Sequence, residues 1–317
     1  MADDKTFRVD NFIIQNQAAI YSAKRPKAEQ LSLDGFAPLP PFEFWATLAC
    51  YSLLDPKKPA ESVFTTTATL LETLGFARVA NEALGGYDSY PSDAYQMVEQ
   101  ALHRLYSTPI YWRGFWHVRT GKAGRPKKRW VEYSGYIITE FEYVYRSDVI
   151  SPIEAKESQR RDVNKTDIKG EFKPPIWKLT NGPKPIGVSF RLASKLVQGL
   201  TNEGENIGHT IMPFSIFELR PIFGPYPLAT RLLMKVVRDV NRKPRIGIDK
   251  LIAAIKMEGR NRSRNQQTVL GYLDMIQASG VISELTYDQA TGLVTYTKNA
   301  DWFFPSGLLT TDEEDEE

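Results

Sequence analysis

Arginine and amide side chains follow one another closely in the last third of the chain. Arginine can donate to guanine O6 and N7 or to phosphate, and asparagine and glutamine match the adenine edge. A helix start also attracts phosphate through its free N–H groups. We therefore expect contact with duplex DNA if a helix begins near residue 262 or 263; the alternative is a polar helix start that only caps itself. The candidate residues are Arg260, Arg262, Arg264, Asn265, Gln266, Gln267 and Thr268.

A second cationic cluster lies between Arg113 and Arg129, where seven residues are basic and none is acidic. Gly124-Arg125-Pro126 resembles the core of an AT-hook, in which an extended Arg-Pro segment lies in a narrow A·T minor groove. The cluster predicts phosphate or minor-groove contact; the alternative is a solvated basic hairpin. Its members are Arg113, Arg119, Lys122, Arg125, Lys127, Lys128 and Arg129. Arg104, just upstream, is a weaker candidate for backbone contact.

The sequence lacks the motifs of common enzyme active sites and metal sites. The sequence contains no phosphate-binding loop of the form G-x-x-x-x-G-K-[ST], no C-x-x-C pair and no H-E-x-x-H motif. Its three histidines, at positions 103, 117 and 209, are scattered, and metal sites need clustered ligands. We expect no enzyme activity, no metal and no cofactor.

The candidate residues need elements to position them, and one order of elements occurs twice. In residues 41–146, apolar spacing predicts a helix reaching Asp55, then a helix capped by Ser62, then a helix capped by Ser92 or Asp93. The third helix would turn His103 and Arg104 outward. A long hairpin with a Gly/Pro-rich turn follows. Residues 227–304 repeat this order, with a second helix capped by Asp249, Val269 and Ile276 on the inner face of the third, and a hairpin turn at residues 288–292.

Three helices followed by a hairpin is the order of a winged helix-turn-helix, which places its third helix in the major groove. We therefore predict an α+β fold with two winged helix-turn-helix domains joined by a charged linker. The predicted divisions are an N-terminal arm at 1–36, winged-helix domain 1 at 37–150, a linker at 151–175, winged-helix domain 2 at 176–305 and an acidic tail at 306–317.

Composition sets the remaining bounds. The chain has 317 residues, 42% of them hydrophobic, which is enough for about two packed domains. The formal net charge is +2, but the last six residues are all acidic, so the remainder carries +8. The single cysteine, Cys50, lies in an apolar run and is expected to be buried. No apolar run approaches about 18 residues and no signal-peptide pattern opens the chain, so we expect a cytoplasmic protein without membrane contact.

Taken together, these features resemble plasmid replication initiators of the iteron-binding type, which have tandem winged-helix domains. The resemblance covers residues 38–304 and rests on the architecture and on the segments RNRSRNQQTVLGYL and LATRLLMKVVRDV. It implies that residues 262–268 read bases in origin repeats, while Arg104 and the basic hairpin hold the DNA backbone. It also implies a homodimer formed by the first domain and recruitment of host replication proteins, a helicase and the host's own initiator.

Two other functions stay open. A winged-helix transcriptional regulator would use the same residues on a single palindrome, and a nucleic-acid-coating protein would use the basic surface without sequence preference. The acidic tail and the length of the first hairpin depart from the initiator pattern, which leaves the role of the first domain open.

Overall fold

The protein has a mixed α+β fold that divides into two compact units. The N-terminal unit comprises residues 9–209, and the C-terminal unit comprises residues 210–317 with residues 1–8. None of the described helices is both long and apolar enough to cross a membrane. The computed structural model describes residues 6–10, 13–14, 21–23, 36–81, 87–118, 127–144, 185–197, 200, 209–239, 241–257, 259 and 261–303.

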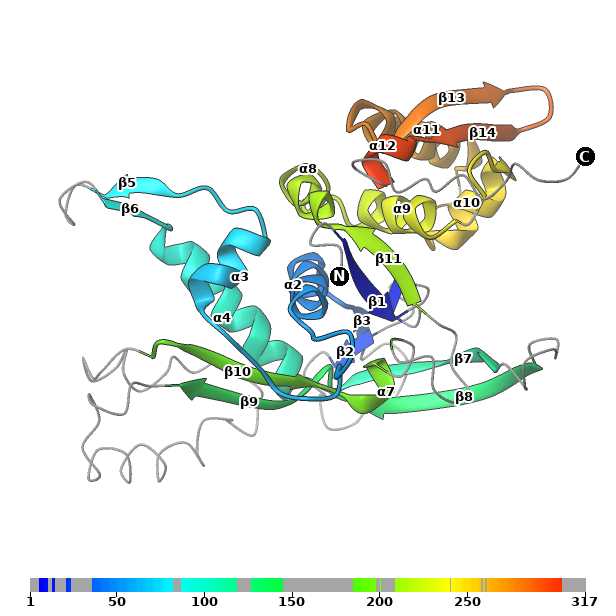
Figure 1. Cartoon of the computed structure of the whole chain (residues 1–317). Helices are drawn as coiled ribbons and strands as arrows, with labels where there is room; N and C mark the ends of the chain where they lie inside the picture. The colour runs from blue at the N-terminus through cyan, green and yellow to red at the C-terminus, as the bar shows by residue number, and fades with distance from the viewer. Residues whose placement is uncertain are drawn as a thin grey trace, which may run out of the picture. The chain divides into compact units, whose positions relative to one another are not determined.

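Among the described residues, the N-terminal unit contains three longer helices and two sheets of three or more strands, which are labelled in Figure 1. Its helices are α2 (Pro41–Ser52), α3 (Thr67–Thr73), α4 (Ser92–Ser107) and the short α7 (Ser194–Val197). Its strands are β2 (Tyr21–Ala23), β3 (Phe36–Pro38), β4 (Val63–Thr65), β5 (Val79–Asn81), β6 (Tyr87–Ser89), β7 (Ile110–Val118), β8 (Lys127–Gly135), β9 (Ile138–Val144) and β10 (Gly187–Leu192).

Helix α2 is the centre of this unit. Pro41 stands at its first position, where a missing N–H costs nothing. Residues 43–51 are all buried, with Phe44, Trp45 and Leu48 fully so, which means that the helix is enclosed by protein on all sides. The Tyr51 hydroxyl donates to the carbonyl of Leu196, which ties α2 to α7. Cys50 is buried beside these residues, as expected from its apolar neighbours.

The second predicted helix begins later than the sequence indicated. Residues 63–65 form strand β4, and α3 is capped by Thr66, whose hydroxyl accepts from the Thr69 N–H at 3.0 Å. Ser62, the expected cap, instead donates to a carboxylate oxygen of Glu140 at 3.2 Å. A three-residue strand is too short to show an alternating pattern, so its pairing decides its structure.

Strand β10 closes the sheet of this unit, although we expected residues 176 onward to belong to the second domain. It pairs antiparallel with both β9 and β4, and the sheet order is β4-β10-β9. Val188, Phe190 and Leu192 are buried. A Cβ added to Gly187 would lie 2.3 Å from the carbonyl oxygen of Thr65, so the strands meet too closely there for any other residue. The predicted linker, 151–175, lies outside the described residues.

The predicted hairpin of the first copy divides between two sheets. Strands β7 and β8 pair antiparallel from Ile110↔Gly135 to Val118↔Lys127 and continue into a sheet of order β3-β2-β7-β8. Strand β9 was expected to extend the same hairpin, but it pairs with β10. A further hairpin, β5 with β6, lies between α3 and α4.

The C-terminal unit follows the predicted order closely (Figure 1). Its helical elements are a 3-10 helix (Phe214–Leu219), α8 (Arg220–Phe223), α9 (Pro227–Arg238), α10 (Ile248–Ala254), α11 (Arg262–Ala278) and α12 (Ala300–Phe303). Its strands are β1 (Thr6–Asp10), β11 (His209–Pro213), β12 (Arg245–Gly247), β13 (Ile282–Asp288) and β14 (Leu293–Lys298). β1 pairs with β11, and Phe7 stacks on Phe217 with ring centroids 5.5 Å apart.

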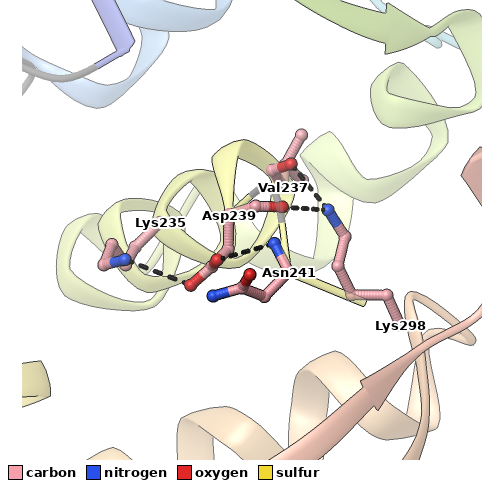
Figure 2. A network of polar contacts seen from close by, with 5 residues as sticks. All are labelled: Lys235, Val237, Asp239, Asn241 and Lys298. Atoms are coloured by element: carbon pink, nitrogen blue, oxygen red, sulfur yellow. Dashed lines mark hydrogen bonds and ion pairs between the residues drawn. The ribbon is translucent and has the colours of Figure 1, made fainter. Parts of the chain in front are cut away.

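A polar brace joins the last strand to the end of α9 (Figure 2). The Lys298 ammonium donates to the carbonyls of Val237 at 3.0 Å and Asp239 at 2.7 Å. It also lies 4.0 Å from the ring centroid of Phe303. Burial lowers the pKa of Lys298 to about 8. The Asp239 carboxylate is engaged separately, with the Lys235 ammonium at 3.4 Å. The cation thus satisfies carbonyls that a helix end leaves without partners.

The two units repeat one topology with closely matched lengths. α2 and α9 each have 12 residues, and both begin at a proline. α3 and α10 each have 7 residues, and α4 and α11 have 16 and 17. The corresponding sheets have the orders β4-β10-β9 and β12-β14-β13, so in each the last strand lies between the other two. The helix order of the repeat agrees with the sequence prediction, but the strands of the first copy are β9 and β10 and not the β7–β8 hairpin that we expected.

Candidate nucleic-acid interface

Helix α11 has a buried face and an outward face. Val269, Leu273 and Ile276 are fully buried, and the helix packs against α9, α10 and β13. With 3.6 residues per turn, Arg264 and Gln267 point to the opposite side, where both are exposed. The inner face predicted from the sequence is therefore the one observed.

The start of α11 is fixed by its own side chains. The Asn261 carboxamide oxygen accepts from the Arg264 N–H at 3.0 Å and caps the helix. The Thr268 hydroxyl donates back to the carbonyl of Arg264 at 2.9 Å. The Asn261 cap stabilises the first turn, and the Thr268 bond satisfies its hydroxyl within the helix. The main chain that carries the candidate residues is thus well defined before any partner binds.

Three of the candidate residues hold neighbouring elements together. Arg262 donates two hydrogen bonds to the Asp249 carboxylate of α10, one of them from Nε at 3.2 Å. Gln266 donates to the same carboxylate at 3.4 Å. Asn265 donates to the carbonyl of Gly259 at 3.1 Å, in the connection before the helix. The first two contacts link α11 to α10, the third links α11 to the segment before it, and all three leave fewer donors for a ligand.

The Asp249 carboxylate is the acceptor on which this arrangement depends. Hydrogen bonding from Arg262 lowers its pKa, and the same contact raises the pKa of Arg262. We predicted that Asp249 caps α10, but the cap position is Gly247. The side chain serves α11 instead. Only a three-dimensional contact between two helices could have shown this.

Arg264 and Gln267 are placed differently from these residues. Among the described residues, neither side chain has a hydrogen-bond or ion-pair partner, and both are exposed. They lie about one turn apart on the outward face. Their donors and acceptors are therefore available to a ligand without breaking a contact of the described structure.

The charge around this helix start is positive. In residues 241–264, the exposed described residues include seven Lys or Arg side chains and one acidic side chain, Asp249. The cations are Arg242, Lys243, Arg245, Lys250, Lys256, Arg262 and Arg264. Such a local excess raises the concentration of a polyanion near the surface. Arg260 lies outside the described residues.

The turn between β13 and β14 contributes no cation. Residues 289–292 contain neither Lys nor Arg. Asp288 organises the turn by accepting from the Ala290 N–H at 3.0 Å and the Thr291 hydroxyl at 2.6 Å, and these bonds lower its pKa. Gly292 has φ of 65°, a conformation that glycine adopts without strain. The bonds of Asp288 stabilise the turn itself, and the exposed cations lie in residues 242–264, on α10, α11, β12 and the segments next to them.

Helix α4, the counterpart of α11, presents different chemistry. Its first turn contains Asp93 and no Lys or Arg. Arg104, near its other end, donates to the Glu43 carboxylate of α2 at 2.6 Å, and Glu43 is buried. His103, expected to face outward, is only 7% exposed, because α4 packs against both α2 and β9. The structure thus gives Arg104 an internal partner.

The basic hairpin of the N-terminal unit is described only in part. Arg113 lies in β7, and Lys127, Lys128 and Arg129 lie in β8, with Arg113 opposite Glu132 and Arg129 opposite Trp116 in the backbone register. Arg119, Lys122 and Arg125 are outside the described residues. The structure therefore places the strands on which this cluster is carried and leaves its DNA contact a prediction.

Comparisons with known proteins return few matches. No protein-family model and no curated protein matches the chain. A crystal structure of domains 2 and 3 of RctB aligns over 82% of this chain and 82% of that chain, with 10% identity and a TM-score of 0.38. A structure of the selenomethionine derivatives of the same domains aligns over 81% of this chain and 82% of that chain, with 10% identity and a TM-score of 0.41. Likenesses at this level do not identify site residues.

Proposed function

We propose that this protein binds specific duplex DNA, and that the C-terminal unit is a winged helix whose α11 enters the major groove. The observation that carries the proposal is the pair Arg264 and Gln267, exposed one turn apart and without partners among the described residues. Arginine suits the two acceptors of guanine, and glutamine suits adenine. The element order α9-β12-α10-α11-β13-β14 matches that expected of a winged helix.

The residues of α11 that are hydrogen-bonded to Asp249 help to hold the outward face of the helix in place. Because Asp249 holds Arg262 and Gln266, the first turn of α11 needs little further ordering when DNA binds. A binding surface that is already ordered loses less entropy on association. We assign Arg264 and Gln267 to base contact, and Arg262, Asn265, Gln266 and Thr268 to holding the helix.

The N-terminal unit would act as a second winged helix with a different contact. Its sheet order repeats that of the C-terminal unit, but α4 begins with Asp93 in place of arginine. Base reading by α4 is therefore disfavoured. Phosphate or minor-groove contact by the β7–β8 hairpin is the contribution we propose for this unit, because its connecting segment is strongly basic.

Two DNA-binding units in one chain suit a long site, and origin recognition for a plasmid or similar element is the biological role we propose. In this proposal the protein binds DNA without catalysis. It also self-associates and recruits a host helicase and the host initiator. The alternative role is transcriptional regulation. Repeated sites beside an A·T-rich stretch would favour initiation, and a single palindrome would favour regulation.

Selection of duplexes from a randomised library by the full chain tests the proposal. We expect enrichment of a defined sequence, which binds at least about 10³-fold more tightly than scrambled duplex at physiological salt. Arg264→Ala should remove most of this preference. Equal affinity for the enriched and scrambled duplexes would leave only non-specific coating, and would overturn sequence-specific binding.

A further inference from the structure

A glycine lies at the centre of the outward face of α11. Gly271 follows Arg264 by seven residues and Gln267 by four, and the helical repeat places the three within about 60° of one another. Along the axis, Gly271 is about 10 Å beyond Arg264. It is exposed, and it lies within the helix rather than at either end.

Nothing in the described structure requires glycine at this position. An added Cβ would meet no atom within 4 Å. Among the described residues, φ is positive at Gly75, Lys256, Gly280 and Gly292 and not at Gly271. A glycine inside a helix destabilises it relative to alanine, because the unfolded chain has more freedom to lose. Gly271 therefore lowers the stability of α11 relative to alanine, and no contact among the described residues explains why glycine is present.

We propose that Gly271 is the point at which α11 comes closest to DNA, and that its missing side chain sets how deeply the helix enters the groove. This inference rests on the proposed function. A helix with its side chains is about 10–12 Å across, and the major groove is about 12 Å wide. Because the two widths are nearly equal, an added side chain at the centre of the inserted face would leave less room for the main chain to approach the bases.

The absence of a side chain at Gly271 would also let Arg264 and Gln267 reach base edges at the same time. Arg264 and Gln267 can reach base edges only if the helix axis lies near the groove floor. Gly271 would lie at the next turn along the same face, where a Cβ would press on the duplex first. Gly271 is a positioning residue in this scheme, because it acts through the depth of Arg264 and Gln267 and makes no hydrogen bond of its own through a side chain.

Two substitutions at this position test the inference in the full chain, with the duplex enriched from the randomised library as probe. Gly271→Ala and Gly271→Leu should both raise the melting temperature by a few degrees, since alanine and leucine are better helix formers. Binding to the enriched duplex should weaken by about tenfold or more for alanine, and further for leucine. Binding to scrambled duplex should change much less.

Ala278→Leu is the matched control, because it adds bulk to an exposed position on the same face at the far end of α11. It should leave binding unchanged. Unchanged affinity in both Gly271 variants, or an equal loss in Ala278→Leu, would overturn the role of Gly271 while leaving specific binding intact. Absence of any preferred duplex for the unmodified chain would overturn both the inference and the proposed function.

Discussion

The Arg104 guanidinium lies 2.6 Å from a carboxylate oxygen of Glu43, and this pair joins the third helix of the N-terminal unit to the first. Glu43 is almost fully buried, whereas Arg104 is about half exposed. The buried carboxylate depends on this partner. Arg104 was a candidate for phosphate contact, but its geometry favours a structural role.

Arg104→Met should therefore act on stability. We expect a loss of about 1–3 kcal/mol in the free energy of unfolding, because a charged buried acceptor loses a hydrogen bond. Urea unfolding measures it, and Glu43→Leu combined with Arg104→Met should recover part of the loss. The salt dependence of DNA binding should not change. A shallower salt slope with unaltered stability would instead identify Arg104 as a phosphate contact.

Arg264 and Gln267 should contribute to base reading. Replacing either by alanine should cost about 1–3 kcal/mol in binding the enriched duplex and much less on random duplex. Fluorescence anisotropy with labelled duplexes gives both affinities. Thr286→Ala, at an exposed position of β13, is the control and should be neutral. If both α11 variants lose specific and random binding equally, neither residue reads bases.

Asp249 should restrain non-specific binding. Asp249→Asn removes the charge that neutralises Arg262, so that guanidinium becomes available to phosphate. Affinity for random duplex should rise, and the slope of log affinity against log salt should steepen by about 1. The ratio of specific to random affinity should fall. Arg262→Gln in the same background should restore the original slope; a slope that never changed would mean that the pair does not affect DNA binding.

The Lys298 brace predicts a particular dependence of stability on pH. Burial lowers the folded-state pKa of Lys298 to about 8 from an ordinary value of 10.5, so the folded protein releases this proton before the unfolded chain does. Stability from this group should therefore rise as the pH increases above about 8. The Cys50 thiol, whose pKa burial raises from 9.0 to about 12, opposes this trend above pH 9.

Between pH 8 and 9 the contribution of Lys298 is the larger of the two, because the Cys50 thiol of the unfolded chain ionises mainly near and above pH 9. Lys298→Met retains most of the side chain that packs on Phe303 and removes the titrating group. Denaturant unfolding at several pH values should give a rising stability in the unmodified protein and a flatter profile in this variant. Identical slopes would show that Lys298 is not the titrating group.

The basic hairpin should contribute phosphate contacts. Replacing Arg125, Lys127, Lys128 and Arg129 by alanine should preserve the fold, because a hairpin tip buries little surface. The slope of log affinity against log salt should decrease by up to about 4, from a total that reflects on the order of 6–10 phosphates. Footprints lost only over flanking A·T tracts would indicate minor-groove insertion; unchanged affinity and footprint would show that the hairpin does not contact DNA.

Local patterns predicted the C-terminal unit well. The spacing of Val269 and Ile276, with either Tyr272 or Leu273 between them, predicted the inner face of α11, and Asp288 with Gly292 predicted the turn between β13 and β14. Both signals are contained within one element or one turn. They can be recognised in the sequence because neither depends on pairing with a distant segment.

The rest of the fold depends on partners distant in the sequence. β4 is only three residues long, and its structure is decided by pairing with β10. β10 pairs with Val63–Thr65 and Ile138–Val144, which are both distant from it in the sequence. Its own residues do not show these partners, so the segment looked equally suited to begin the second domain. Likewise, no local pattern could show that Asp249 accepts hydrogen bonds from α11. Gly271 was not a candidate because glycine has no side chain that could contact a ligand.

The middle position of β10 determines where this chain can be divided for separate expression. A fragment ending at residue 175, where the sequence suggested a domain boundary, would retain β4 and β9 but lack the strand between them. Such a fragment would expose two strand edges and tend to aggregate. A division just before β11 keeps the β4-β10-β9 sheet whole, although it separates β1 from its partner β11. A synthetic peptide covering residues 185–197, added to the shorter fragment, should restore its solubility by supplying the missing strand.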